Sequence, residues 1–175
     1  MLQQHVNVRY APAQAGDFAS ANPRASMLAG PNSLVAGVGG VLIAAFAWAA
    51  STGSTDIETG ETDFYNTVTN AGSGAPSGFV HREMQALITT FLAENGATIP
   101  QGNPVTLHVA GDFWVKNSGA GAATVGQKVF ASNTTGLAAT AAAGATVAGY
   151  TETKWFVMSA AAAGEVFKMS SYPLG

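Results

Sequence analysis

The chain has 175 residues, enough for one domain with a sizeable core. It carries 7 Lys and Arg residues against 10 Asp and Glu residues, a formal net charge of −3, and no cysteine. This excludes disulfides and thiolate chemistry, and it leaves too few clustered cations for a nucleic-acid partner. Only 10% of the residues are charged, against about 25% in a typical globular protein, which indicates either a surface covered in an assembly or a neutral exported domain.

The first 32 residues contain three prolines, at positions 12, 23 and 31, and no sustained hydrophobic period. We expect 1–32 to form an extended N-terminal arm that precedes a β-rich domain over 33–175. The segment begins without the basic residues and apolar run of a signal peptide.

Residues 33–52 are uncharged and have about the minimum length of a membrane helix. Glycines interrupt the run at 37, 39 and 40, and four carboxylates follow it where a membrane span would have basic anchors. We therefore predict no membrane partner. The segment is better read as two short strands, 33–36 and 41–48, that form a buried hairpin around the glycines.

Residues 51–77 are polar and rich in turn formers, and they predict a loop with at most one short strand near 64–69. Their carboxylates lack the spacing of a calcium loop. A strand is expected to run through Val80. The segment 82–94 then has a helical apolar period and some strand-like features, so it predicts either one short helix or an irregular crossover.

From residue 104 onward the pattern is β. A turn at 110–112 divides 105–117 into two strands, and we expect His108 and Trp114 to lie opposite each other as a cross-strand pair. Their apolar neighbours, namely Leu107, Val109, Phe113 and Val115, would share the other face.

Further strands are predicted at 125–131, 153–159 and 165–171, the last two joined by the loop 160–164. Low complexity is confined to the Ala/Gly stretch 136–149. Short strands with small-residue turns favour a mainly β fold, a sandwich or jelly-roll-like domain with at most one short helix.

No motif for catalysis or cofactor binding emerges. The Gly-rich segments 37–42 and 121–128 fail the phosphate-binding patterns, so no cofactor is expected. No two histidines have the spacing of a zinc motif, and a metal site would have to be assembled from distant residues; none is predicted. His81 and Glu83 could serve acid–base chemistry, but no nucleophile elbow or partner carboxylate accompanies them, which favours a polar patch at a sheet edge or subunit contact. Trp48, Trp114 and Trp155 are read as core or interface anchors.

Several segments together resemble the structural cement, or decoration, proteins of tailed-phage capsids: "GDFASANPRASMLAGPNSLVAGVGG" (16–40), "FAWA" (46–49), "GFVHREMQALITTFL" (78–92), "VTLHVAGDFWVKN" (105–117), "VGQKVFA" (125–131) and "TKWFVMSAAAAGEVFKMSS" (153–171). The resemblance implies a β-sandwich or jelly-roll-like subunit that forms homotrimers on the outer capsid surface of the virion. Such trimers bridge neighbouring major capsid protein subunits. The resemblance does not extend to 51–77, and it assigns no functional residue individually.

The leading hypothesis is therefore a non-enzymatic cement protein, and deletion of residues 1–20 is expected to leave a folded trimer with weaker capsid binding. The alternatives are a carbohydrate- or receptor-binding β-module that uses Trp114, and a small hydrolase centred on His81 and Glu83. For the leading hypothesis, we expect contacts with the capsid or with neighbouring subunits at Phe18, Pro23, Arg24, His81, Arg82, Glu83 and Trp114.

Overall fold

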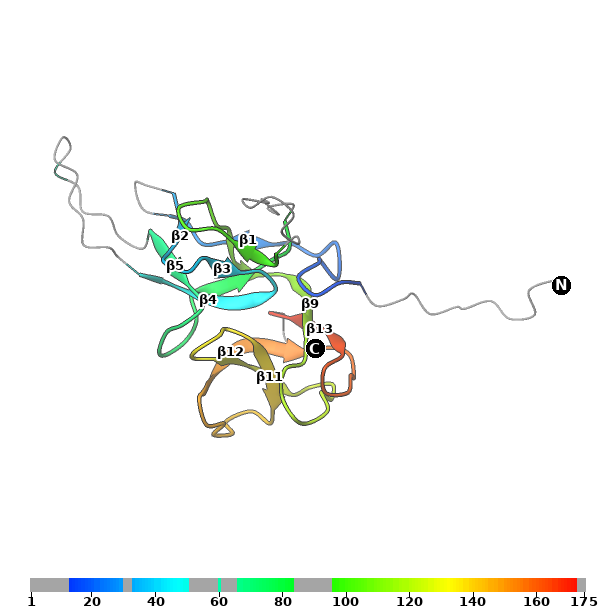
Figure 1. Cartoon of the computed structure of the whole chain (residues 1–175). Helices are drawn as coiled ribbons and strands as arrows, with labels where there is room; N and C mark the ends of the chain where they lie inside the picture. Colours follow the sequence, from blue (N-terminus) through cyan, green and yellow to red (C-terminus); the bar gives the residue numbers. More distant parts are fainter. Residues whose placement is uncertain (1–12, 30–32, 51–59, 61–65, 84–95, 173–175) are drawn as a thin grey trace.

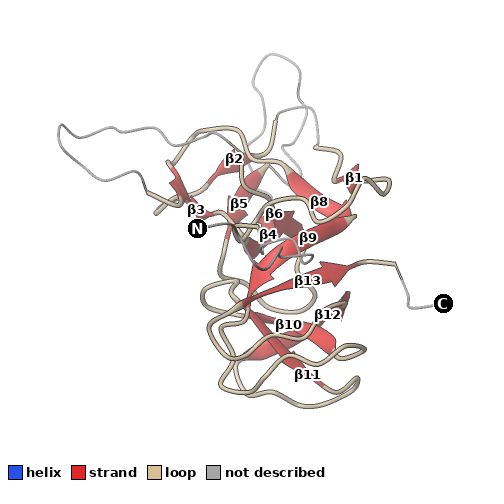
Figure 2. Ribbon diagram, turned by 90° about the vertical axis from the view of Figure 1, so that its right-hand side faces the viewer, coloured by secondary structure: helices blue, strands red, loops and turns tan. Residues whose placement is uncertain are grey.

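The computed structural model describes residues 13–29, 33–50, 60, 66–83 and 96–172 (Figure 1). All regular structure in these residues is β, in thirteen strands that form three sheets. The two larger sheets lie one above the other in Figure 1, and Figure 2 shows β10 to β13 as a layer below the remaining strands. The prediction of a mainly β, sandwich-like fold is confirmed.

The larger sheet has six strands in the order β1-β8-β6-β4-β5-β2. All of its pairings are antiparallel except that of β2 with β5, in which Val35 lies beside Thr67. The strands are β1 (Ala25–Ser26), β2 (Val35–Ala36), β4 (Ala45–Ala50), β5 (Thr67–Thr69), β6 (Gly78–Val80) and β8 (Leu107–Ala110).

The second sheet has five antiparallel strands in the order β11-β10-β12-β13-β9. They are β9 (Asp112–Lys116), β10 (Lys128–Ser132), β11 (Ala138–Ala141), β12 (Tyr150–Val157) and β13 (Val166–Ser170). A separate two-stranded sheet pairs β3 (Val41–Leu42) with β7 (Thr98–Ile99).

The centre of the six-stranded sheet is buried on both faces, because the side chains of β4 and β6 alternate between two cores. In β4, Phe46 and Trp48 enter a core shared with the five-stranded sheet, whereas Ala47 enters the core on the opposite face. The first core is aromatic and includes Phe79, Phe113, Trp155 and Phe167. The second is aliphatic, with members such as Val41, Val68, Ile99 and Leu107.

Burial on both faces explains why residues 33–50 carry no charge, but the predicted hairpin is wrong. A turn does form at the glycines, where the Gly40 N–H donates to the Gly37 carbonyl at 3.0 Å and Gly39 has φ +88°. The strands on either side of this turn do not pair with each other. Instead β2 pairs with β5, and β3 with β7. The aliphatic core lies between these elements, so the turn changes layers instead of closing a ribbon.

The predicted pairing of 105–110 with 112–117 is also wrong. β8 pairs with β6 and β1, whereas β9 pairs with β13 in the other sheet. The chain changes sheets at Gly111, whose φ of +133° is accessible mainly to glycine. His108 and Trp114 are therefore not a cross-strand pair, and Leu107 and Phe113 enter different cores.

The remaining strand predictions agree better with the structure. The strand predicted near 64–69 is found at Thr67–Thr69, the strand through Val80 is found at Gly78–Val80, and β12 pairs with β13 as predicted. The Ala/Gly stretch hides β11, which the sequence pattern missed. The predicted helix or crossover at 82–94 lies almost wholly outside the described residues.

Residues 13–29, here called the N-terminal segment, run along an edge of each large sheet. The Gly16 N–H donates to the Trp114 carbonyl at 2.7 Å, and the Trp114 N–H donates to the Asp17 carbonyl at 2.9 Å. The Ala19 N–H donates to the Asp112 carbonyl at 2.9 Å. Farther along, β1 pairs with β8, and the Met27 N–H donates to the Leu107 carbonyl. The N-terminal segment therefore covers the outer edges of β9 and β8, which protects both edges from pairing with other chains.

Candidate functional site

Three side chains that can bind protons or metals meet where β6 ends beside β8. His81 follows the last residue of β6, and His108 lies on β8, where Phe79 is its strand partner. The Nε2 atom of His108 is 2.9 Å from Nδ1 of His81, and Nε2 of His81 is 3.3 Å from a Glu83 carboxylate oxygen. We call these residues the His–His–Glu cluster.

One hydrogen bond joins the two rings, and either ring can donate it, depending on the tautomers. The Glu83 carboxylate, 3.3 Å from His81 Nε2, favours a proton on that nitrogen, which leaves His81 Nδ1 to accept from His108 Nε2–H. The other ring nitrogen of His108 is Nδ1. This atom is buried and has no hydrogen-bond partner among the described residues. A buried polar atom without a partner is unusual in a folded protein.

Apolar and aromatic groups surround the two imidazoles. Phe18 of the N-terminal segment stacks on His81 at a centroid distance of 4.6 Å, and Phe113 lies 5.1 Å from His108. The Arg24 guanidinium lies over the Phe18 ring, 3.8 Å from its centroid. The histidines are consequently 8% and 7% exposed, whereas Glu83 is more accessible.

Burial lowers the pKa of both histidines, because the charged imidazolium loses its hydration. For His81 burial is the largest cause; Glu83 and Asp17 raise its pKa in part, and Arg24 lowers it further. For His108, burial followed by the repulsion from His81 and Arg24 lowers the pKa to about 4. Both rings are therefore neutral near pH 7 and offer lone pairs.

The structure gathers most of the predicted contact residues around the N-terminal segment. Phe18 and Arg24 lie over the cluster, and Arg82 forms an ion pair with Asp17 at 3.1 Å. The Pro23 carbonyl accepts a hydrogen bond of 2.6 Å from the Tyr172 hydroxyl. Trp114 joins this region through its backbone only, because its half-buried ring faces Lys168 at 5.0 Å.

The other two tryptophans, Trp48 and Trp155, are buried in the aromatic core, as expected for core anchors.

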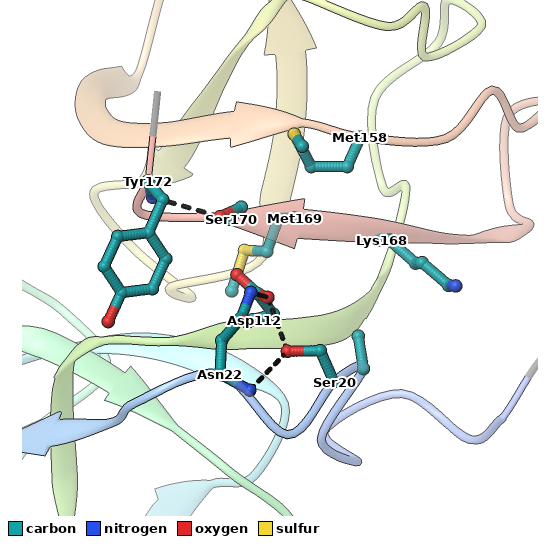
Figure 3. Close-up of a pocket in the computed structure, with 9 residues that line it drawn as sticks. Ser20, Asn22, Asp112, Met158, Lys168, Met169, Ser170 and Tyr172 are labelled. Carbon is teal, nitrogen blue, oxygen red and sulfur yellow. Dashed lines mark hydrogen bonds between the residues drawn. The ribbon is translucent and has the colours of Figure 1, made fainter. Parts of the chain in front are cut away.

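A pocket of about 340 Å³ lies beside the N-terminal segment, between it and β13 (Figure 3). One Asp112 carboxylate oxygen accepts hydrogen bonds of 2.6 Å from Ser20 and Asn22, whereas its second oxygen is buried and has no partner among the described residues. Lys168 and Tyr172 also line the pocket. Such a lining can accept a hydrogen bond from a small polar group.

Sequence reasoning identified His81 and Glu83 but missed His108 as their partner, and it missed Asp17 and Asp112. The alternation along β6 and β8 was the available signal, since Phe79 and His108 are neighbours in register and His81 projects to the same face two residues on. Using it required knowing that β6 pairs with β8.

The described residues include no helix long and apolar enough to span a bilayer.

The chain was compared with curated proteins, solved structures and protein families. A search of curated proteins finds no matching relative. Among solved structures, a chain of "The capsid of Myoviridae Phage XM1" is similar with a TM-score of 0.57 and 17% identity, over 97% of this chain and 96% of that chain, which shows a shared fold. The model of the XM1 gp53 minor capsid protein family matches residues 2–171, so the chain belongs to this family.

Proposed function

We propose that this protein is a cement protein that binds the outside of a phage capsid as a homotrimer and bridges neighbouring major capsid protein subunits. The observation that carries the proposal is the family match, which spans nearly the whole chain and describes a minor capsid protein. A structural role in the capsid needs no catalytic site, so we propose no enzymatic activity.

The surface of the described residues suits extensive contacts with other subunits. Leu28 is 92% exposed and Val38 is 84% exposed, and Val125 is also largely exposed. With so few charges in the chain, these side chains sit on a surface that is weakly hydrated for a free monomer. Burial against subunits or capsid would remove this apolar area from water.

The N-terminal segment supports a location for the contacts. Phe18, with Arg24 over its ring, stacks on His81 of the His–His–Glu cluster, and Asp17 pairs with Arg82, so most of the predicted contact residues lie around the cluster. We propose that this area faces a neighbouring subunit or the capsid. The arm of residues 1–32 would extend the contact. Because a trimer carries three arms, binding of one arm would raise the effective concentration of the other two at the capsid and so increase the overall affinity.

The segment also changes the design of the truncation test. Deleting residues 1–20 removes Phe18 and the backbone hydrogen bonds of residues 16–19 with β9, and it thereby exposes a sheet edge. Deletion of 1–12 leaves these contacts in place. We expect this shorter truncation to remain folded and to bind expanded heads at least about tenfold more weakly, the scale of a lost tethered contact.

The test combines native mass with binding to heads. Light scattering should give three times the single-chain mass of 17.6 kDa. Electron cryomicroscopy of expanded heads, assembled from the major capsid protein encoded with this chain and saturated with the purified protein, should show density across subunit boundaries on the outer face. Density inside the shell, or none on expanded heads, contradicts the proposal.

The carbohydrate-binding alternative depends on Trp114, which is the one described tryptophan outside the buried core. Its ring is partly engaged by Lys168. Glycan-array binding that Trp114→Ala abolishes would favour this alternative, particularly if the same variant still decorates heads normally.

A further inference from the structure

The His–His–Glu cluster brings together the ligand types that borderline transition metals prefer. Two imidazoles and one carboxylate converge, and one potential ligand atom from each residue can be chosen so that all three lie within 4.8 Å of one another. We propose that His81, His108 and Glu83 form a binding site for a zinc-type divalent metal ion, with water completing the coordination. This inference is independent of the capsid role.

The three side chains lie near one another, but an ion would have to draw them closer. Bonds of 2.0 to 2.1 Å in a tetrahedral site place neighbouring ligand atoms about 3.4 Å apart. With one atom taken from each residue, the candidate ligand atoms lie within 4.8 Å of one another. The shorter separations of 2.9 Å and 3.3 Å involve different nitrogens of His81, so one nitrogen of that ring must move toward both partners before an ion can bind. The metal bonds then replace the hydrogen bonds of the cluster.

The hydrogen-bond pattern favours this exchange. Without metal, His108 has one nitrogen bonded to His81 and one buried nitrogen without a partner among the described residues. The network that metal binding would replace is therefore incompletely satisfied.

The surroundings select the class of ion. A single carboxylate with two imidazoles is a poor site for calcium or magnesium, which require several oxygen ligands. Phe18 and Phe113 shield the imidazoles from bulk water, whereas Glu83 remains accessible and gives the ion a route of entry. Such an apolar shell around a partly open ligand set is typical of metal sites that keep a water position.

A bound ion would tie the end of β6 to β8 beneath Phe18. These elements meet the N-terminal segment at the same place, so the ion would fix the region that carries most of the predicted contact residues. Metal binding should therefore raise the melting temperature of the protein and slow the release of the N-terminal segment.

The experiment uses the full chain without a histidine tag, stripped with EDTA and then dialysed into chelator-free buffer. Calorimetric titration with zinc chloride should give one ion per chain with a dissociation constant in the micromolar range or below. Replacing zinc by Co²⁺ should give the visible absorption of a four-coordinate nitrogen–oxygen site. Calcium and magnesium should give no comparable binding at the same concentrations.

Variants locate the site. His108→Phe keeps an aromatic ring of similar size without ligand atoms, and Glu83→Gln removes the charge of the accessible ligand. We expect each to weaken zinc binding by roughly tenfold or more, the usual effect of losing a ligand or its close support. His5→Ala changes the remaining histidine of the sequence and should leave the affinity unchanged.

The outcomes separate cleanly. An absence of zinc binding by the native chain overturns the proposal, and so does binding that is equally strong in Glu83→Gln and His108→Phe. Loss of binding in His5→Ala alone would place the ion elsewhere and also overturn it. If His108→Phe does not fold, Glu83→Gln still decides the question, because Glu83 lies outside both cores.

Discussion

The two large sheets are built from different kinds of sequence. The five-stranded sheet uses the consecutive strands β9 to β13. Three of its four pairings join strands that follow each other in the chain or have one strand between them. The six-stranded sheet collects β1, β2, β4, β5, β6 and β8 from between residues 25 and 110. Three of its five pairings are equally close in the chain, and the other two join β2 to β5 and β1 to β8. The pairing of β1 with β8 closes the longest stretch of chain in either sheet, and longer loops close at a higher entropic cost, so we expect the five-stranded sheet to open last during unfolding.

The aromatic core makes the six-stranded sheet dependent on the five-stranded one. Phe113 lies at their junction, with ring centroids 5.0 Å from Phe79 and 5.5 Å from Trp155. We expect Phe113→Ala to reduce the free energy of unfolding by about 3–5 kcal/mol, because it leaves a cavity between the sheets. Urea unfolding followed by tryptophan fluorescence measures this loss.

Phe156→Ala is the matched control for the junction. Phe156 is a half-buried residue of the five-stranded sheet outside the aromatic core, with the Lys128 ammonium 3.7 Å from its ring centroid. We expect this change to reduce the free energy of unfolding by about 1 kcal/mol. Equal losses in the two variants would contradict the idea that the aromatic junction unites the sheets.

A second link between the sheets is a backbone contact at Gly136. The Phe46 N–H of β4 donates to the Gly136 carbonyl at 2.8 Å, and a Cβ at Gly136 would overlap the Phe46 carbonyl oxygen. We expect Gly136→Ala to cost about 1–3 kcal/mol more than Gly144→Ala, because overpacking adds to the backbone strain. Faster hydrogen exchange of the Phe46 amide would report the broken link.

Gly144 provides a close control because its φ of +73° is nearly that of Gly136, at +69°, while a Cβ there meets nothing within 4 Å. The two alanine variants therefore share the left-handed backbone strain and differ in the contact alone. Similar stabilities would show that the turn can move away from β4 at little cost.

The difference between the sheets also determines what the sequence could predict. The strand pair β12 and β13 follows from two β patterns around a short loop, and its pairing is local. Two other short turns, at 37–40 and at Gly111, misled the prediction because the chain changes layers there. A local pattern shows that the chain turns; it does not show which strand lies beside the next one.

The same distinction applies to the His–His–Glu cluster. His81 and Glu83 are two residues apart, so their proximity could be predicted from the sequence. His108 joins them only because β6 pairs with β8 in a register that places Phe79 beside His108. The role of Phe18 as a cover depends in turn on the position of the N-terminal segment along β9.

The cluster makes the stability of the six-stranded sheet depend on pH. His108 has a pKa of about 4 in the folded protein, below its ordinary value of 6.5, so the unfolded chain binds the proton more readily. The contribution of neutral His108 to the free energy of unfolding is therefore fully present above about pH 6.5, and it is lost as the pH falls toward 4. His81 acts in the same direction, with Glu83, Arg24 and Asp17 facing it.

We expect the urea midpoint of the native chain in EDTA to fall between pH 7 and pH 5, and the midpoint of His108→Phe to fall less. Urea titrations at several pH values measure both curves under identical conditions. Parallel curves would show that the buried histidines do not contribute to the pH dependence.

The smallest effect is expected at the ion pair between Arg82 and Asp17. The N···O distance is 3.1 Å, but the two side chains are 46% and 33% exposed, and exposed pairs contribute about 0–1 kcal/mol. We expect Asp17→Ala to reduce the free energy of unfolding by less than about 1 kcal/mol, with little further loss in high salt. The backbone hydrogen bonds of residues 16 and 17 with Trp114 and Arg82 survive this change.

Gly16→Ala is the stronger perturbation of the same segment. Gly16 has φ +95°, and a Cβ there would lie 2.8 Å from the Arg82 Cβ. If the backbone holds the N-terminal segment against the sheets, this variant should lower the urea midpoint more than Asp17→Ala. The opposite order would mean that side-chain charge holds the segment, and salt alone could then release it from the edge of β9.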